Sequence, residues 1–306
     1  MQGWAHRARG VWVLANTPRS VFSPLPTFAF SLFFLYQHPI GLTFPSLAAC
    51  ASGIAFSLFS VWGANIWNNV SDLSDDIAAG RVNALTTGDV SPSNAIVLAA
   101  SFYAMGVLVS VFGFSMNKAI TVILALAFCV VTFLYSWNEV RPLSGKRLKE
   151  HWAGEVLVYA VAIPTHTLAL TAIYSPIDAR ALAISIPIFS YLFTGLLLKD
   201  IKDISSDSSA GYRTLGVEFS AASLIRGGFA LLLIFYAGAT VLATMGIVGR
   251  GGLLVLICLV IFLLGVVIPL YSQRWKLTIT DGGRINLLAK NTYAALLLWG
   301  LGSALG

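Results

Sequence analysis

Long apolar runs separated by short polar segments dominate the chain. A helix needs roughly 20 apolar residues to cross a hydrocarbon core about 30 Å thick, and lipid offers no partner to an unpaired backbone group. The runs that approach this length cover residues 20–36, 45–67, 93–114, 118–137, 153–173, 178–199, 222–247, 251–272 and 285–305. The pattern predicts an all-α membrane protein with nine transmembrane helices. The first run is the weakest because Pro24 and Pro26 lie near its start, so an eight-span arrangement with a re-entrant first run stays open.

Composition excludes the main alternatives to a membrane protein. Of the 306 residues, 57% are hydrophobic and only 10% are charged, with a mean hydropathy of +0.81. A soluble domain has about a quarter of its residues charged, and a disordered chain is poor in apolar residues. Cys50, Cys129 and Cys258 each lie inside an apolar run, so we expect them to pack as small hydrophobic side chains.

The basic residues indicate an orientation. The N-terminal segment and the loops after the second, fourth, sixth and eighth runs hold most of them, whereas Lys118, Arg180 and Arg250 fall on the opposite side and Lys290 lies inside the last run. By the positive-inside rule the lysine- and arginine-rich side is cytoplasmic. This distribution explains the net charge of +6 without nucleic acid, because no basic patch stands outside the apolar runs.

Two acidic motifs lie at the cytoplasmic ends of even-numbered runs. Asn68, Asp72 and Asp76 are spaced i, i+4 and i+8 after the second run, and Asp75 could join them. The sixth run ends in a second motif with spacing i, i+3 and i+7, formed by Asp200, Asp203 and Asp207. On a helix each set shares one face. The recurrence suggests a four-helix unit used twice, similar in topology and not in close sequence identity.

Facing carboxylates at a membrane border are costly unless a cation lies between them. Oxygen-only ligands suit Mg²⁺, which takes its remaining ligands from water and substrate phosphates, and neither motif has the histidine or cysteine typical of zinc or copper sites. Diphosphate is the natural bridging anion. The basic residues that accompany the motifs are Arg81, Lys146, Arg147, Lys149, Lys199, Lys202 and Arg213.

These motifs resemble those of the UbiA-type superfamily of intramembrane prenyltransferases. The first motif reproduces the family's Asn-x-x-x-Asp-x-x-x-Asp pattern, and the second is similar to its Asp-x-x-Asp-x-x-x-Asp signature, including the downstream Gly211 and the Thr214-Leu215 pair. A Tyr-Ser pair, Tyr135 and Ser136, followed by a basic cluster is also similar. The resemblance spans nearly the whole chain, residues 1–306, as a single domain.

The resemblance implies nine helices ringed around a central cavity, with a cytoplasmic-side cap formed by the loops after helices 2 and 6. It implies Mg²⁺ as cofactor, a prenyl diphosphate as substrate and the lipid bilayer as surroundings. The implied metal ligands are Asn68, Asp72, Asp76, Asp200, Asp203 and Asp207. The implied catalytic residues are Asp72, Asp76, Asp203 and Asp207. The implied diphosphate-binding residues are Asn68, Arg81, Lys146, Arg147, Lys199, Lys202, Arg213 and Tyr135.

Two reactions are compatible with this resemblance. The first is transfer of the prenyl group to a small acceptor, such as an aromatic acid, a quinone precursor or a lipid alcohol. The second is cyclisation of the prenyl chain onto itself, which a departure from the family pattern keeps open: Asn83 and Ala84 stand where an arginine and a proline are frequent, and Arg81 is the nearby substitute. A transporter is disfavoured because transporters usually place ionisable groups near the membrane midplane, not at one border.

Other polar residues have simpler interpretations. We expect solvated loop charges at Asp89, Glu139, Glu150 and Glu218, and interfacial anchors at Lys149 and Arg226. His166 is expected to be a hydrogen-bonded helix residue. The aromatic residues in runs expected to line the cavity are Trp62, Phe133, Trp137, Tyr159 and Phe193.

Overall fold

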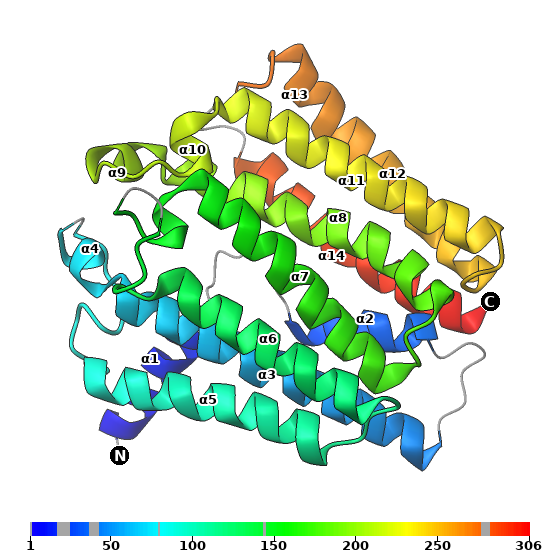
Figure 1. Cartoon of the computed structure of the whole chain (residues 1–306). Coiled ribbons are helices and arrows are strands. Elements are labelled where there is room, and N and C mark those ends of the chain that lie inside the picture. Colours follow the sequence, from blue (N-terminus) through cyan, green and yellow to red (C-terminus); the bar gives the residue numbers. More distant parts are fainter. Residues whose placement is uncertain (1, 17–24, 37–42, 79, 143–144, 277–281) are drawn as a thin grey trace.

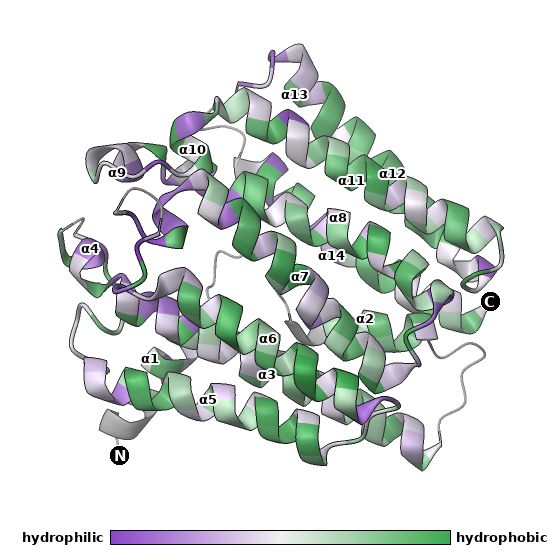
Figure 2. Cartoon of the chain, viewed as in Figure 1, coloured by the Kyte–Doolittle hydropathy of each residue, from purple (hydrophilic) through white to green (hydrophobic). Residues whose placement is uncertain are grey.

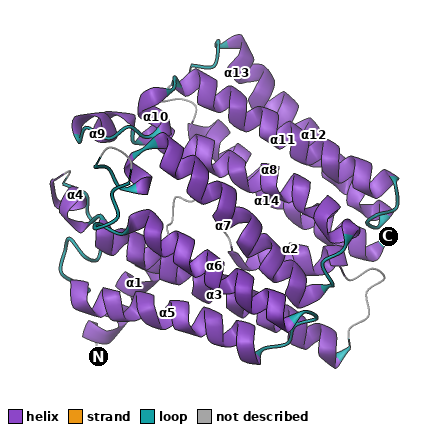
Figure 3. Cartoon of the chain, viewed as in Figure 1, coloured by secondary structure: helices purple, strands orange, loops and turns teal. Residues whose placement is uncertain are grey.

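The computed structural model describes residues 2–16, 25–36, 43–78, 80–142, 145–276 and 282–306 (Figure 1). Within these ranges the chain forms helices joined by turns and loops, with no strand (Figure 3). The expectation of an all-α protein is confirmed for the described residues.

Seven helical segments in the described part of the chain are long and apolar enough to cross a membrane. They are α3 (Phe44–Ser71), α5 (Pro92–Phe112), α6 (Lys118–Ser136), α7 (Trp152–Tyr174), α8 (Ala179–Lys199), α11 (Ala221–Thr244) and the segment Arg250–Ser272. The last segment combines η3 (Arg250–Leu254), α12 (Val255–Phe262), a π-helical turn (η4, Leu263–Val267) and α13 (Ile268–Ser272). These seven correspond to the second to eighth apolar runs of the sequence.

The first and last apolar runs have a different character. Helix α2 spans Leu25–Tyr36, only 12 residues, and the earlier part of that run lies outside the described residues. Helix α14 spans Gly282–Leu305 and is long enough, but its first half carries Arg284, Lys290 and Asn291. The two helices pack against each other, and α1 (Gln2–Ala15) packs on α3.

The long helices pack in neighbouring pairs, α3 with α5, α6 with α7, and α8 with α11. Small residues allow close approach between α3 and α5: a Cβ atom added to Gly106 would lie 3.2 Å from the backbone nitrogen of Ser60. Small residues at helix interfaces are typical of membrane bundles, where packing and not water exclusion drives association. A buried aromatic cluster that includes Phe235, Tyr236 and Trp299 joins α11 to α14.

Large apolar side chains cover the outside of the bundle, as the green faces of α5, α6, α11 and α12 show in Figure 2. Leu108, Ile123, Ile234 and Leu264 are each at least half exposed. Such a surface would be unfavourable in water and is suited to lipid tails. The helices therefore form a multi-pass bundle embedded in a bilayer.

One end of the bundle is polar. Helices α4 (Leu73–Ala78), α9 (Ile204–Ser209) and α10 (Leu215–Glu218) lie there, beyond the ends of α3 and α8 (Figures 1 and 2). The short turns η1 (Leu148–Glu150) and η2 (Asp200–Lys202) belong to the same end.

Backbone hydrogen bonds join two of the loops at this polar end. The Trp152 N–H donates to the Arg213 carbonyl at 2.7 Å, and the Arg213 N–H donates to the Glu150 carbonyl at 2.8 Å. These bonds form an isolated parallel bridge between His151 and Arg213. The loop after α6 and the loop after α8 are thereby held together above the bundle.

Candidate active site

The first acidic motif is divided between two helices. Helix α3 ends at Ser71 with Asp72 as its C-cap, and Asp76 lies in the separate short helix α4. The prediction of one continuous helical face is therefore wrong beyond Asp72, although the Asp76 N–H still donates to the Asp72 carbonyl at 2.8 Å. Asn68 Nδ2 donates to Asp72 Oδ2 at 3.1 Å, and Asn68 Oδ1 accepts from Ser136 Oγ at 2.8 Å.

Arg81 connects the two motifs. Its Nη1 lies 3.3 Å from Asp76 Oδ1, and its Nη2 lies 3.4 Å from Asp203 Oδ1 and 3.1 Å from Ser206 Oγ. One guanidinium therefore contacts carboxylates from α4 and from the turn between α8 and α9. Arg81 and Asp203 are 122 residues apart in the sequence, and their contact shows that the two motifs lie at the same end of the molecule.

Asn83 occupies the position where the family pattern often has arginine. Its Nδ2 donates to Asp76 Oδ2 at 2.8 Å, and its Oδ1 accepts from the backbone N–H groups of Leu85 and Thr86 at 2.9 and 3.0 Å. Such a side-chain turn is typical of asparagine in loops. Asn83 therefore supports a motif carboxylate and its own loop.

The second motif places its carboxylates in different surroundings. Asp200 is 5% exposed, and its Oδ1 lies 2.9 Å from Lys199 Nζ while its Oδ2 has no hydrogen-bond partner among the described residues. Asp207 Oδ2 accepts from Thr214 Oγ1 at 2.9 Å. The side chain of Lys202, a predicted diphosphate ligand, lies outside the part of the chain that is described.

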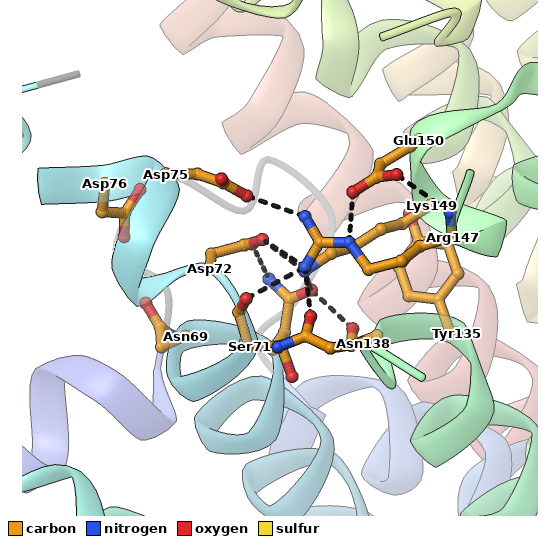
Figure 4. Close-up of polar contacts among 12 residues, drawn as sticks. Asn69, Ser71, Asp72, Asp75, Asp76, Tyr135, Asn138, Arg147, Lys149 and Glu150 are labelled. Carbon is orange, nitrogen blue, oxygen red and sulfur yellow. Dashed lines mark hydrogen bonds and ion pairs between the residues drawn. The ribbon is translucent and has the colours of Figure 1, made fainter. Parts of the chain in front are cut away.

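Arg147 is enclosed among polar groups beside the first motif (Figure 4). All three of its guanidinium nitrogens donate hydrogen bonds. The acceptors are Asp75 Oδ2 at 2.7 Å, Asn138 Oδ1 at 2.7 Å, the Ser71 carbonyl at 2.9 Å, the Tyr212 hydroxyl at 3.2 Å, and Glu150 Oε1. Asp72 Oδ1 is farther away, at 3.8 Å. This geometry makes Arg147 a cross-link between the end of α3, α4 and the loop before α10.

The same contacts shift the pKa values of the two ion-pair partners. Burial would raise the pKa of Asp75, but hydrogen bonds from Tyr212 and Arg147 lower it below its ordinary value. Burial opposes the charge on Arg147, yet its bonds to Asp75 and Glu150 raise its pKa further. Both groups are therefore charged at neutral pH.

Two interpretations of charged residues in this region are wrong. Glu150 is not a solvated loop charge: it is 4% exposed and bound to the side chain and backbone N–H of Arg147. Lys149 is not an interfacial anchor, because it is buried against Asp72 and Asn68 Oδ1, the latter at 3.3 Å. Burial lowers the pKa of Lys149, with the Asp72 charge opposing the effect.

His166 also differs from expectation. Its Nε2 is buried and has no hydrogen-bond partner among the described residues. Its ring instead stacks against the rings of Phe28 and Phe56, with centroids 5.8 and 5.5 Å away. Within the described part of the chain, His166 is therefore a core side chain packed against aromatic rings.

Some predicted diphosphate-binding residues point to other partners in this structure. Lys146 Nζ donates to the Gly211 carbonyl at 2.9 Å and lies over the Tyr212 ring. Arg213 pairs with Glu218 at 2.6 Å. Neither cation contacts a motif carboxylate, so their role in diphosphate binding stays a prediction.

Three further residues belong to the site without having been assigned to it from the sequence. Glu155, in the first turn of α7, contacts Lys199; Tyr212 and Asn138 contact Arg147. An acidic residue inside an otherwise apolar run was a usable signal for Glu155. Tyr212 and Asn138 lie in loops, where no periodicity predicts a contact.

Burial is the main cause of raised pKa values in Asp76 and Asp207. Nearby carboxylates add to the effect: Asp72 acts on Asp76, and Asp200 and Asp203 act on Asp207. A positive charge placed among these groups would favour their ionised forms. The electrostatics of the site therefore favour a cation.

The donor set can be tested against a divalent metal. Among the described side chains, no three His, Cys, Asp or Glu residues already form a compact metal cluster. The motif donors are nevertheless all oxygen atoms, as Mg²⁺ prefers, and the buried Asp200 Oδ2 has no partner in the described part of the chain. Lys149 and Arg81 at present neutralise Asp72 and Asp76. The residues fit a hard cation that competes with these basic side chains.

A polar cavity of ≈ 380 Å³ opens beside the first motif. Its lining residues are Ser74, Asp75, Asn138, Arg141, Gly145, Lys146, Arg147, Glu150, Ala210 and Tyr212. A second cavity, of ≈ 460 Å³, lies near the start of α8, beside Arg180 and Ile247. Neither is the apolar central hollow expected from the sequence, which stays a prediction.

Comparisons with known proteins agree with this architecture. The model of the UbiA prenyltransferase family matches residues 23–282. An uncharacterised protein of Archaeoglobus fulgidus is 30% identical over 229 residues, which are 73% of this chain and 76% of the relative.

Solved structures show the same fold. A structure of digeranylgeranylglyceryl phosphate synthase has a TM-score of 0.65 at 14% identity, covering 97% of this chain and 99% of the other. A UbiA homologue from Archaeoglobus fulgidus bound to GPP and Mg²⁺ has a TM-score of 0.63 at 15% identity, covering 96% and 99%. A third structure, of a UbiA homologue from Archaeoglobus fulgidus bound to DMAPP and Mg²⁺, has a TM-score of 0.60 at 19% identity, covering 93% of this chain and 98% of the other. With two acidic motifs at one polar end of a helical bundle and a family match over most of its length, the chain belongs to the UbiA prenyltransferase family.

Proposed function

We propose that the protein is a Mg²⁺-dependent intramembrane prenyltransferase that ionises a polyprenyl diphosphate and transfers the prenyl group to a small aromatic, quinone-precursor or lipid acceptor. The observation that carries this proposal is the contact of Arg81 with both Asp76 and Asp203. It brings two carboxylate motifs together at the polar end of an apolar bundle. An amphiphile with a charged head and an apolar tail matches that division.

The solved relatives support the substrate class. Two of the structurally similar UbiA homologues were bound to GPP or DMAPP together with Mg²⁺. Both ligands are prenyl diphosphates of short chain length. We propose the same class of substrate for this chain, without a choice of chain length or acceptor.

The finer architecture is part of the proposal. Helices α2 and α14 pack on each other, and they also contact α3 and α12 respectively. They would complete a ring of nine helices around a central cavity. The polar end would face the cytoplasm, with α4, α9 and α10 as its cap.

We assign roles to the side chains at the polar end. Asn68, Asp72, Asp76, Asp200, Asp203 and Asp207 would hold Mg²⁺, which when bound supplies positive charge opposite the leaving diphosphate. Arg81 and Lys199 would donate hydrogen bonds to diphosphate oxygens, and Tyr135 would place its hydroxyl beside Lys199, to which it lies 3.3 Å away. Lys146, Lys202 and Arg213 remain proposed contacts at the rim.

The apolar bundle has its own task. Ionisation leaves an allylic cation, which water would capture if it reached the tail. A helical bundle lined by apolar side chains excludes water from that region. Aromatic rings beneath the polar end, such as Trp67 and Phe133, which stack 4.7 Å apart, can stabilise a cation by roughly 0.5–2 kcal/mol each.

An intramembrane terpene cyclase is the second candidate. One observation favours it: Asn83 uses its side chain on Asp76 and on its own loop, where the family pattern often places an arginine. The chain thus lacks one cationic group that would be available to an acceptor. The cyclase would use the same ionisation and let a double bond of the prenyl chain capture the cation.

The test uses the full-length protein in liposomes with prenyl diphosphates of several lengths. We expect Mg²⁺-dependent release of inorganic diphosphate, lost in Asp72→Ala and Asp203→Ala while both variants remain inserted. Glu139→Ala, which changes an exposed loop carboxylate, is the matched control and should retain activity. Full activity in either motif variant would contradict the assigned roles.

Mass analysis of the organic products separates the two reactions. A cyclic hydrocarbon formed without added acceptor supports the cyclase. Turnover that begins only when an acceptor is supplied supports transfer.

A further inference from the structure

Glu155 is a buried carboxylate that belongs to neither acidic motif. It lies in the first turn of α7 and is 1% exposed. A carboxylate removed from water costs several kcal/mol unless its oxygens are paired and hydrogen-bonded. The contacts of Glu155 show how this cost is offset.

Both oxygens of Glu155 are engaged. Oε1 accepts from Lys199 Nζ at 2.6 Å and from the Tyr135 hydroxyl at 3.4 Å, and Oε2 accepts from the Leu215 backbone N–H at 3.0 Å. These partners come from α6, from the end of α8 and from the start of α10. One side chain therefore joins three elements that surround the second motif.

Lys199 is held between two carboxylates. Its Nζ lies 2.6 Å from Glu155 Oε1 and 2.9 Å from Asp200 Oδ1, with the Tyr135 hydroxyl at 3.3 Å. The ammonium group donates two of these contacts as hydrogen bonds, to Glu155 and to the Tyr135 hydroxyl, and its contact with Asp200 is an ion pair. A lysine on a flexible stem has many rotamers, and this arrangement selects one of them.

The segment next to Leu215 is tied to the same motif. Thr214 donates to Asp207, and a Cβ atom on Gly216 would lie 2.7 Å from the Asp200 carbonyl. The Glu155 contact to the Leu215 N–H therefore fixes a backbone that packs directly on the second motif. Glu155 sets the position of this backbone and of Lys199 together.

We propose that Glu155 is a positioning residue for the diphosphate site, acting through Lys199 without touching the substrate. The inference rests on the proposed function because it requires Lys199 to bind diphosphate. Glu155 holds the ammonium group at the polar mouth beside Asp200. When diphosphate enters, Lys199 exchanges one of its present acceptors for a phosphate oxygen while Glu155 keeps the stem in place.

Positioning and simple charge make opposite predictions. Glu155 is negative, so if it acted only through its charge, its neutralisation would strengthen the binding of an anion. If it positions Lys199, neutralisation frees the lysine stem and weakens binding. The sign of the change in affinity therefore decides between them.

Glu155→Gln is the informative variant because glutamine keeps the size and a carbonyl oxygen that can accept from the Leu215 N–H. We expect the dissociation constant for inorganic diphosphate with Mg²⁺, and the KM for geranyl diphosphate, to rise about tenfold, as for loss of one charge-assisted hydrogen bond. Glu139→Gln removes an exposed loop carboxylate that is outside the proposed diphosphate site and is the matched control. It should leave both quantities unchanged.

A double-mutant cycle with Lys199→Met tests whether the effect runs through the lysine. In the Lys199→Met background we expect Glu155→Gln to cause no further loss of affinity. Additive losses, or tighter binding by Glu155→Gln alone, would overturn the inference. If Glu155→Gln unfolds in detergent, Glu155→Asp replaces it, because aspartate retains the charge on a shorter stem. We expect Glu155→Asp to raise the KM by less than tenfold. An unchanged KM would count against positioning.

The wild-type protein separates this inference from the proposed function. If it neither binds diphosphate with Mg²⁺ nor releases it from a prenyl diphosphate of any length tested, the proposed function fails. If it does both and the cycle is additive, only the role of Glu155 fails.

Discussion

Replacing Arg147 with methionine removes the charge and all five hydrogen bonds of the guanidinium group while keeping an unbranched stem in the same space. The Arg147 side chain is 3% exposed and the Glu150 side chain is 5% exposed, so the replacement leaves the Glu150 carboxylate buried without its cation. Removing one partner of a buried ion pair costs about 3–5 kcal/mol. The side chain of Asp75 is 36% exposed, so its share adds at most about 1 kcal/mol.

Equilibrium unfolding of the detergent-solubilised protein by titration with sodium dodecyl sulfate measures this cost. Arg141→Met is the matched control because Arg141 is an exposed arginine on the same loop that donates to the Asn138 carbonyl, and we expect a loss of about 0–1 kcal/mol. Arg147→Lys should recover only part of the stability, since one ammonium group cannot span Asp75 and Glu150. Equal losses for Arg147→Met and Arg141→Met would refute the assignment of Arg147 as a buried cross-link.

Two further predictions concern a titrating carboxylate and a helix contact. Folding raises the pKa of Asp76, so ionisation of this carboxyl lowers the stability of the wild type as the pH rises above the ordinary pKa of aspartate. In metal-free detergent, the thermal midpoint of Asp76→Asn should therefore increase relative to that of the wild type over the same pH range. A difference that stays constant with pH would argue against the burial effect. A Cβ atom on Gly53 would lie 1.8 Å from the Tyr174 hydroxyl, so Gly53→Ala should lower the free energy of unfolding by about 1–3 kcal/mol. Gly283→Ala, whose Cβ atom would meet none of the described residues within 4 Å, should change the free energy of unfolding by no more than about 0.5 kcal/mol. Similar losses for both variants would contradict the close approach at Gly53.

The long helices were predictable from hydropathy because each must satisfy its own backbone in lipid. The second to eighth apolar runs correspond to helices within a few residues of the expected ends. Hydropathy alone was weaker for α14, whose Asn291 is buried and bonded to Tyr236 and to the Cys258 carbonyl. A polar residue lowers the hydropathy of a segment even when tertiary hydrogen bonds make its burial in the bundle favourable, and the sequence does not show those bonds.

The acidic motifs were predictable as groups, and their detailed geometry was not. Helical spacing placed Asn68 and Asp72 on one face, but that rule holds only while the helix continues, and α3 ends at Ser71. The basic residues were harder, because loop folding decides their partners. Lys149 and Arg147 lie two residues apart, yet Lys149 donates a hydrogen bond to Asp72 whereas Arg147 donates hydrogen bonds to Asp75 and Glu150.

The bridge between His151 and Arg213 uses main-chain atoms alone. Amino-acid replacement alters side chains and leaves peptide groups in place, so evolutionary drift at these positions preserves the join, with proline as the exception because it lacks an N–H. The side chains of both loops can therefore change while the backbone connection between the two loops is kept.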